Sequence, residues 1–331
     1  MQQITIVGLG LIGGSIGLAL KRWSAENDNA LKIIGFDTDL SHQQAAKKMN
    51  AVDDTAWSLP DAISEADVVI IATPVGAMKQ VFEDIGPHLK LNAIVTDTGS
   101  TKADVLEWAR SLPGHVNFIG GHPMAGKSDS IEAASADLFE NASWVVCPSP
   151  TANETAIKNV LGLIAAAHAE PYFVEPEEHD SYVAGISHLP FIVAASLVKT
   201  TTTDRAWRDM STLASTGFRD TTRLALGSPE MHRDITLTNR EAIARWIDNM
   251  IGTLEEFREL LNEANDAELR EQIGEFFQEA QDLRAKAEVV KPRAAEMEVD
   301  DARASTGNVM RSMFFGGLGK REDKDRDRRR K

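Results

Sequence analysis

The feature that most constrains the fold is a glycine-rich turn close to the first residue of the chain. Residues 3–8 form an apolar run that predicts a β-strand, and a helical apolar pattern follows to about Trp23. The turn between them is a G-x-G-x-x-G motif made of Gly8, Leu9, Gly10, Leu11, Ile12 and Gly13. In such a unit the first glycine permits the turn, the second lets a pyrophosphate approach, and the third lets helix and strand pack closely. The motif therefore predicts that the free N–H groups at the start of this helix bind a dinucleotide phosphate.

Strands alternate with helical patterns through the first half of the chain. Continuous Val/Ile runs, without polar alternation, are typical of strands that are covered on both faces. Strands separated by helices indicate parallel βαβ units. The predicted strands are residues 3–8, 32–36, 66–74, 92–97, 116–120, 143–147 and 171–176.

After Glu175 the strand signal stops and the remaining periodicity is helical. Over residues 239–263 apolar side chains recur at steps of three and four, and this stripe is wider than one neighbouring helix covers. An apolar face of that width predicts a homodimer. We expect an α/β Rossmann-type domain with a mainly parallel sheet over residues 1–174, then an all-α substrate and dimerisation domain over residues 175–290, then a disordered tail over residues 291–331.

Composition excludes several classes of protein. The formal net charge of −15 disfavours a nucleic-acid partner or an anionic membrane surface. No apolar run approaches the ~20 residues that a membrane helix needs, and the N-terminus does not read as a signal peptide. Cys147 is the single cysteine, which fits a reducing compartment. We therefore expect a cytoplasmic protein with neither a nucleic-acid nor a membrane partner.

An acidic residue at the end of the second strand indicates which dinucleotide binds. Asp37 lies roughly 20–25 residues after the glycine motif, where a carboxylate meets the ribose hydroxyls. It would accept from the 2′-OH of NAD and repel the 2′-phosphate of NADP, and residues 36–41 contain no lysine or arginine to bind that phosphate. NAD is therefore the predicted cofactor. Thr73 ends the third strand at the same edge, either as a cofactor contact or as part of an ordinary turn.

Two residues after later strands are candidates for acid–base chemistry. His122 follows the strand at residues 116–120 in a Gly-Gly-His-Pro sequence, which we expect to be a stiff loop on the cofactor side. Its imidazole could accept the proton of a substrate hydroxyl, or His122 could be only a loop residue. Ser100 follows the strand at residues 92–97. Its hydroxyl either caps the next helix, as that of Thr101 would, or faces substrate and His122.

Three further residues could contact a polar substrate. Lys102 is either an anion contact or a solvated lysine, and His188 either lines a cavity where Pro190 interrupts its helix or lies in the core. Arg219 and Arg223 share one helical face, as a guanidinium fork for a carboxylate or as part of a surface ion pair. No His or Cys residues recur at metal-ligand spacing, so we predict no metal.

These motifs together resemble the prephenate/arogenate dehydrogenase family of tyrosine biosynthesis. The resemblance implies a Rossmann-type domain followed by a helical dimerisation domain. It also implies oxidative decarboxylation of prephenate to 4-hydroxyphenylpyruvate, or of arogenate to tyrosine, with NAD accepting the hydride. The matching segments are IVGLGLIGGSIGLAL, GFDTD, VVIIATPV, VTDTGSTK, GGHPMAG, ADLFENASWV, EEHDSYVAGISHLPF, GFRDTTRLA and MHRDI.

The resemblance also implies roles for individual residues. His122 matches the family's catalytic histidine, which takes the ring hydroxyl proton, and Ser100 matches the serine that positions that hydroxyl. His188 and Arg223 match side chains that hold polar groups of the substrate, and Lys102 matches a basic position near the site. His232 departs from the family, because relatives often have an aromatic residue there. Residues 127–128 depart as well, since relatives often have an acidic residue at this point.

Two other functions are compatible with the nucleotide motif. A dehydrogenase of the β-hydroxyacid type has a similar two-domain build, but it usually has a catalytic lysine in a G-x-x-x-K pattern on the first long interdomain helix. The corresponding segment here, AGISHLPF, has no lysine. A non-catalytic NAD-sensing regulator would keep the glycine motif without needing His122, Ser100 and Arg223 together.

Overall fold

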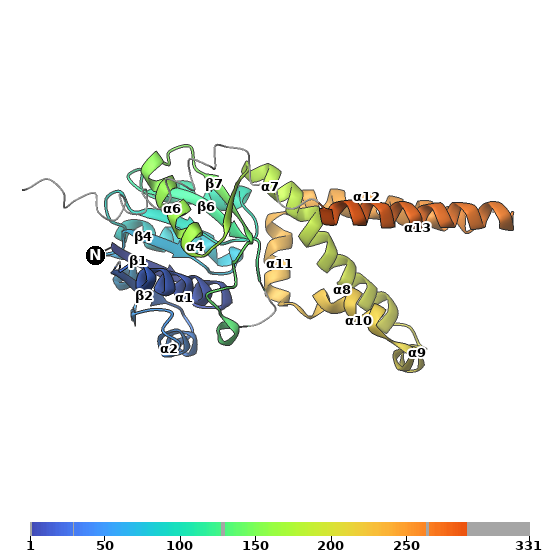
Figure 1. Cartoon of the computed structure of the whole chain (residues 1–331), viewed down its shortest axis with the longest axis horizontal. Coiled ribbons are helices and arrows are strands. Elements are labelled where there is room, and N and C mark those ends of the chain that lie inside the picture. The colour runs from blue at the N-terminus through green and yellow to red at the C-terminus, as the bar shows by residue number, and fades with distance from the viewer. Residues whose placement is uncertain (1, 29, 127–129, 263–264, 290–331) are drawn as a thin grey trace, which may run out of the picture.

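A twisted eight-stranded sheet organises the first half of the chain in the computed structural model (Figure 1), which describes residues 2–28, 30–126, 130–262 and 265–289. The strand order is β3-β2-β1-β4-β5-β6-β7-β8, and every neighbouring pair is parallel except β6 and β7. The predicted Rossmann-type fold with a mainly parallel sheet is confirmed. The strands are β1 (Gln2–Val7), β2 (Leu31–Phe36), β3 (Asp54–Thr55), β4 (Val68–Ile71), β5 (Ile94–Asp97), β6 (Asn117–Pro123), β7 (Ser143–Pro148) and β8 (Glu170–Phe173).

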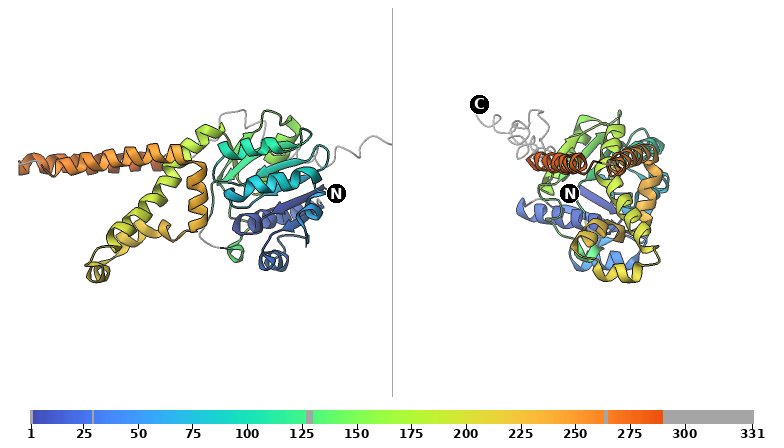
Figure 2. Two further views of the ribbon diagram at one scale, coloured as in Figure 1. Left: turned by 180° about the vertical axis from the view of Figure 1, so that it is seen from behind. Right: turned by 90° about the vertical axis from the view of Figure 1, so that its right-hand side faces the viewer.

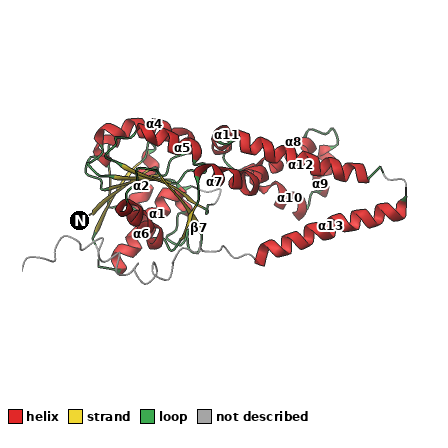
Figure 3. Ribbon diagram, turned by 90° about the horizontal axis from the view of Figure 1, so that it is seen from above, coloured by secondary structure: helices red, strands yellow, loops and turns green. Residues whose placement is uncertain are grey.

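Helices cover both faces of this sheet (Figure 3). One face carries α1 (Leu11–Glu26), α2 (Leu40–Lys48) and α6 (Glu154–Ala166). The other face carries α3 (Leu59–Ile63), α4 (Val75–Ile85) and α5 (Ala103–Trp108). Burial on both sides explains why the central strands read as continuous Val/Ile runs. Short 3₁₀ turns lie at η1 (Gly86–His88), η2 (Ala109–Ser111) and η3 (Ile131–Ala133).

Strand β6 corrects the prediction of a stiff loop around His122. The strand continues through His122 to Pro123 and pairs antiparallel with β7, with His122 opposite Val145. The glycines before it serve close packing. A Cβ on Gly121 would lie 2.5 Å from the carbonyl oxygen of Asp97 and 3.0 Å from the indole nitrogen of Trp144. The Gly-Gly pair therefore lets β6 approach its neighbours and does not make a turn.

The second half of the chain is helical (Figure 2). It begins with α7 (Pro176–Val183), the π-turn η4 (Ala184–His188) and α8 (Leu189–Thr202), which together form one continuous helix. Pro190 does not interrupt this helix, contrary to our expectation. A proline lacks the N–H that an α-turn needs, and the wider π-turn before it accommodates that loss. The remaining helices are α9 (Trp207–Leu213), α10 (Thr216–Thr222), η5 (Arg223–Leu226), α11 (Pro229–Thr238), α12 (Arg240–Leu260) and α13 (Asp266–Val289).

The helix over Pro176–Thr202 is long and apolar enough to span a membrane, by length and composition alone. Our sequence analysis missed a run of this length. The helix nevertheless buries three polar residues, His179, Asp180 and His188, against other parts of the protein. This packing indicates that the helix lies at the junction between the sheet domain and the helical half of the protein.

Helices α12 and α13 project from the rest of the molecule (Figures 1 and 2). Only Ala242 and Ile243 of α12 are buried, although the apolar stripe of this helix continues far beyond them. Trp246, Ile251 and Leu254 of that stripe are exposed. The expected tail, residues 291–331, lies outside the described residues. The predicted domain boundary near residue 174 falls between the end of β8 and the start of α7.

A buried ion pair joins β5 to the N-terminus of α5. The Lys102 ammonium contacts the Asp97 carboxylate, and both side chains are fully buried. Asp97 also accepts hydrogen bonds from the backbone N–H groups of Gly99 at 2.7 Å and Gly121 at 3.1 Å. The carboxylate thereby ties β5, β6 and α5 together at the carboxyl edge of the sheet.

We predict that Lys102→Met lowers the free energy of unfolding by about 3–5 kcal/mol, because it leaves the Asp97 carboxylate buried without a counter-charge. Urea unfolding followed by circular dichroism measures this change. Lys158→Met is the matched control, since Lys158 pairs with Glu154 on the protein surface. Similar unfolding midpoints for the two variants would contradict the prediction.

Candidate active site

The glycines of the turn between β1 and α1 serve two purposes, since some allow close packing of the backbone and one leaves room for a ligand. Gly8 has φ +94°, and a Cβ on Gly13 would lie 1.9 Å from the carbonyl oxygen of Gly8. Both positions therefore exclude a side chain for reasons of packing. Gly10 differs, because a Cβ there would meet no described atom within 4 Å. This open space, at the N-terminus of α1, is where a pyrophosphate would approach the backbone.

Asp37 and Thr73 lie at the same edge of the sheet. One oxygen of Asp37 accepts the backbone N–H of Leu9 at 2.6 Å, and the other accepts the N–H of Asp39 at 2.8 Å. The carboxylate is thereby held against the glycine turn, beside the imidazole of His42 at 3.4 Å. The Thr73 hydroxyl is buried and has no hydrogen-bond partner in the described part of the chain. An acid at the turn and an unpaired hydroxyl both fit a dinucleotide.

His122 begins a chain of hydrogen bonds that crosses from the sheet into the helical half. Its Nδ1 lies 2.9 Å from Nε2 of His179 on α7, and Nδ1 of His179 lies 2.7 Å from a carboxylate oxygen of Asp180. The Asp180 carboxylate also accepts the backbone N–H groups of Lys102 at 2.7 Å and Ala103 at 2.9 Å. It therefore satisfies free donors at the N-terminus of α5.

The surroundings of His122 favour its neutral form. Burial lowers the pKa of His122 well below the ordinary value of 6.5, and the neighbouring His179, Lys102 and His188 side chains act in the same direction. A neutral imidazole near pH 7 has one nitrogen that can accept a proton. The second ring nitrogen, Nε2, forms no hydrogen bond with the residues that the structure describes. His122 is therefore available as a base.

His188 is held as a hydrogen-bond donor. The Asn239 side-chain amide donates to the Asp180 carbonyl oxygen at 2.7 Å and lies 3.2 Å from Nδ1 of His188. Because an amide nitrogen has only hydrogens to offer, Nδ1 accepts and the proton of the neutral ring lies on Nε2. That Nε2 is buried and without a partner among the described residues. Burial also lowers the pKa of His188 to about 4, so the ring is neutral near pH 7.

The surroundings of two other predicted site residues, Ser100 and Lys102, differ from those that the sequence suggested. Ser100 is half-buried, and its hydroxyl forms no hydrogen bond with any described residue. It does not cap α5, since that helix begins at Ala103 with Lys102 as N-cap. Lys102 is neither a solvated lysine nor an open anion contact, because its side chain is fully buried on Asp97. A buried ammonium group needs a counter-charge, and the Asp97 carboxylate supplies it.

Arg223 lies at the start of η5, beside α8, and is exposed. Over the described residues, neither Arg219 nor Arg223 forms an ion pair, so the surface ion pair that we considered with the adjacent aspartate is absent. Asp220 is exposed on α10 as well. The guanidinium of Arg223 is therefore free to bind a ligand.

Sequence reasoning missed four residues that organise this region: His179, Asp180, Asp97 and Asn239. Adjacent His179 and Asp180, at the point where strands give way to helices, were the available signal. Burial separates them from ordinary surface residues, and only the structure reveals it: His179 is 2% exposed and Asp180 5%. His122 and His179 are 57 residues apart, so no local pattern joins them.

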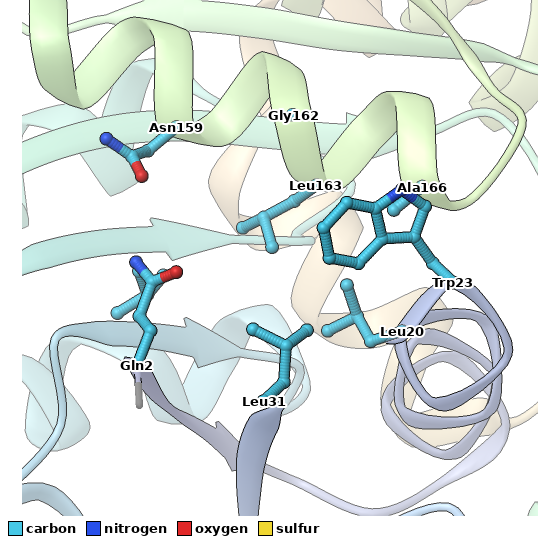
Figure 4. Close-up of a pocket in the computed structure, with 9 residues that line it drawn as sticks. Gln2, Leu20, Trp23, Leu31, Asn159, Gly162, Leu163 and Ala166 are labelled. Carbon is cyan, nitrogen blue, oxygen red and sulfur yellow. The ribbon is translucent and has the colours of Figure 1, made fainter. Parts of the chain in front are cut away.

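A small cavity elsewhere in the molecule is not part of this site (Figure 4). It has room for about 20 Å³ and lies between α1, α6 and the amino ends of β1, β2 and β4, at the edge of the sheet opposite to His122. Its walls are mostly apolar, with Leu20, Trp23 and Leu31 on one side and Leu163 on the other. A cavity of this size holds about one water molecule, so it cannot bind a cofactor or substrate.

Comparisons with known proteins agree with this geometry. The family model described as the nucleotide-binding domain of prephenate dehydrogenase matches residues 16–172, and the model described as its dimerization domain matches residues 175–283. A prephenate dehydrogenase of Bacillus subtilis is 39% identical over 287 residues, which cover 86% of this chain and 75% of that protein. A cyclohexadienyl dehydrogenase of Zymomonas mobilis is 30% identical, over 78% of this chain and 87% of that protein.

Solved structures show the same similarity. The prephenate dehydrogenase of Aquifex aeolicus, in complex with hydroxyphenyl propionate and NAD+, matches with a TM-score of 0.78 and 28% identity, over 87% of this chain and 98% of that chain. The arogenate dehydrogenase of Synechocystis matches with a TM-score of 0.70 and 29% identity, over 85% and 100%. The predicted family, the dehydrogenase activity and NAD as cofactor are confirmed.

The two glycines of the turn predict different defects. Gly10→Ala should leave the melting temperature unchanged, because the added methyl group meets open space. It should weaken NAD binding roughly 10- to 150-fold by displacing a charge-assisted hydrogen bond to the phosphate. Gly13→Ala should lower the melting temperature, since its methyl group collides with Gly8. Differential scanning fluorimetry and NAD titration check both variants, and equal loss of stability would contradict the assignment.

Proposed function

Because the chain belongs to the prephenate dehydrogenase family, we propose that it oxidises and decarboxylates a cyclohexadienol in tyrosine biosynthesis. The substrate is prephenate, which gives 4-hydroxyphenylpyruvate, or arogenate, which gives tyrosine; carbon dioxide is the other product. The observation that carries this proposal is the position of His122. Its neutral imidazole lies at the carboxyl edge of the sheet that also carries the glycine turn, with Nε2 free of partners among the described residues.

In this proposal His122 is the general base. Its Nε2 accepts the proton of the ring hydroxyl while the adjacent carbon loses a hydride, for which bound NAD is the acceptor. The half-buried hydroxyl of Ser100, from the loop between β5 and α5, orients the substrate hydroxyl toward Nε2. A stiff strand holds the base in position, which keeps the reacting atoms close to contact distance.

Loss of the ring carboxylate completes the reaction. The new carbonyl is conjugated through the ring with the carbon that bears the carboxylate, so the C–C bond can break and its electron pair moves toward the carbonyl oxygen. The ring becomes aromatic, and the oxygen takes back the proton held on His122. Atoms and charges then balance with no metal and no Schiff-base lysine.

Two side chains of the helical half are proposed to hold the substrate. The buried N–H at Nε2 of His188 lacks a partner among the described residues, and an oxygen of the anionic substrate would satisfy it. The exposed guanidinium of Arg223 suits a carboxylate, which it can bind through two hydrogen bonds. Lys102 is not included, because its buried pairing with Asp97 gives it a structural role.

We further propose a homodimer that forms through the helical half and functions in the cytoplasm. The exposed apolar side chains on α12, with Ile186 on η4 and Phe277 and Leu283 on α13, make a face too large for a monomer to leave in water. The same partner would cover the apolar side of the helix over Pro176–Thr202, in place of a membrane.

The direct test supplies purified protein with NAD and with prephenate or arogenate in turn, and records NADH formation. Turnover of either substrate supports the proposal, and the ratio of kcat/KM values identifies the preferred one. A non-catalytic NAD sensor would bind NAD without turnover. An enzyme of the β-hydroxyacid type would turn over a hydroxy acid instead.

The pH dependence of kcat/KM should report His122. A base must be neutral, so kcat/KM should rise with pH and reach a plateau above the pKa of His122, which burial places below 6.5. His122→Asn should lower kcat by roughly 10²–10⁴-fold, remove this acid limb and leave NAD affinity nearly unchanged. A His122→Asn variant that kept kcat within a few-fold of the wild type, with the acid limb of the pH profile intact, would contradict this assignment. His188 would then be the next candidate for the base.

Arg223→Ala should raise KM for the cyclohexadienol roughly 10- to 150-fold, the expected loss of a charge-assisted pair, and change KM for NAD little. Steady-state kinetics with each ligand varied in turn measures both constants. Arg208→Ala is the matched control, since Arg208 is an exposed arginine on α9 that was not predicted to bind the substrate. Equal increases in the two KM values would indicate a folding defect.

Placing charges in the apolar stripe should dissociate the dimer. The double variant Ile251→Glu and Leu254→Glu puts two carboxylates on an exposed apolar face of α12 that we expect the partner to cover. Light scattering should give twice the chain mass for the wild type and a single chain for the variant. Leu91→Glu, at an exposed position of the N-terminal half, should stay dimeric. A monomeric wild type at micromolar concentration would rule out the dimer.

A further inference from the structure

The hydrogen bonds around Asp180 have a fixed direction. An ionised carboxylate can only accept, and Asp180 accepts from two backbone N–H groups of α5. The contact with Nδ1 of His179, at 2.7 Å, therefore places a proton on that nitrogen. In a neutral His179 the other nitrogen, Nε2, is then an acceptor.

The same reasoning continues one residue further. Nδ1 of His122 lies 2.9 Å from the acceptor Nε2 of His179, so Nδ1 of His122 carries the proton of its neutral ring. Its lone pair is then on Nε2, the nitrogen without a partner in the described residues. We propose that His179 and Asp180 are positioning residues that hold His122 in the one tautomer able to accept the substrate proton. This inference rests on the proposed role of His122 as the base.

The alternative tautomer would be inactive as a base. With its proton on Nε2, His122 would present a donor to the substrate hydroxyl and could not take a proton from it. A third group that orients the imidazole of the base is the logic of the Ser-His-Asp triad, with His179 inserted here between base and carboxylate. When His122 gains the proton, its Nδ1–H still donates to His179, and the negative charge of Asp180 lies at the end of the same chain.

Other charged groups face this chain from each neighbouring element. Lys102, at the N-terminus of α5, and His188, in the π-turn, both disfavour a charged His122. Asp97 on β5 pairs with Lys102 and neutralises that charge. Asp104, in the first turn of α5, faces Asp180, and both its burial and this neighbouring carboxylate raise the pKa of Asp104. Asp180 is the only carboxylate in the hydrogen-bonded chain of described residues that ends on His122.

The chain also spans the two halves of the protein. His122 belongs to β6 and the N–H donors to α5, whereas His179 and Asp180 belong to α7. A second contact across this junction joins the hydroxyls of Thr101 and Thr238 at 2.9 Å. The tautomer of the base therefore depends on the helical half being seated against the sheet.

Two variants of His179 separate orientation from general packing. His179→Leu introduces an apolar side chain of similar bulk and removes the acceptor for Nδ1–H of His122. It should lower kcat by roughly 10- to 100-fold, by analogy with metal-ligating histidines that lose their orienting partner, with KM for NAD within about twofold. His179→Gln can return an amide oxygen to this position and should recover most of that loss. His115→Asn, at an exposed position just before β6, is the control.

Nitrogen NMR of the full-length protein labelled with ¹⁵N-histidine reads the tautomer directly, above the pKa of His122. The His122 signals, identified by their loss in His122→Asn, should show a protonated Nδ1 and an unprotonated Nε2. In His179→Leu they should shift toward the other tautomer, and in His179→Gln they should not.

A wild-type His122 protonated on Nε2 would overturn the inference, and so would an unchanged tautomer and kcat in His179→Leu. A cationic His179, which would donate to Nδ1 of His122, gives the first of these results. The wild-type spectrum decides the matter even if His179→Leu does not fold. Failure of the proposed function is distinguishable, because it appears as absent turnover of cyclohexadienols in the wild type whatever the spectrum shows.

Discussion

The arrangement of the site depends on one carboxylate at the start of a short helix. Asp180, from α7, accepts two backbone N–H groups of α5 and a ring nitrogen of His179, while its own carbonyl oxygen accepts the Asn239 amide. A buried carboxylate needs such donors, and the free N–H groups of α5 need an acceptor. The Asp180 carboxylate and these N–H groups can pair only when the helical half lies against the sheet. The same contact holds the two histidines, His122 and His188, near one another.

The carboxyl edge of the sheet is closely packed around His122 and leaves more space at Gly10. Around His122 the packing is close, since Gly121 brings β6 against Asp97 and Trp144, and the Lys102–Asp97 pair is fully buried. At the glycine turn Gly10 is only half-buried, and a Cβ on it would meet no described atom within 4 Å. In the proposed reaction, close packing around His122 would keep the reacting atoms near contact distance.

The helical half combines two kinds of surface. The first turns of the helix over Pro176–Thr202 bury polar residues at the junction, whereas α12 and α13 project with apolar side chains exposed. The π-turn at η4 lies between these regions and carries His188. Its wider turn accommodates Pro190 and keeps His188 on the buried face. The proposed substrate-binding and dimer-forming surfaces thus belong to one helical unit.

The sequence by itself determined the features that depend on neighbours along the chain. The glycine spacing indicated the strand–turn–helix unit, the Val/Ile runs indicated a sheet covered on both faces, and Asp37 was the residue from which NAD was predicted. These follow from local backbone geometry and burial patterns, which are legible over a few residues. The tertiary structure alone decided that His122 lies in a strand, that Lys102 is buried on Asp97, and that His179 and Asp180 form a hydrogen-bonded chain with His122. Lys102 and Asp180 are 78 residues apart, and His122 and His179 are 57. Contacts over such separations depend on how the two halves pack, because a side chain's partner is set by the surfaces that meet and not by its own neighbours in sequence.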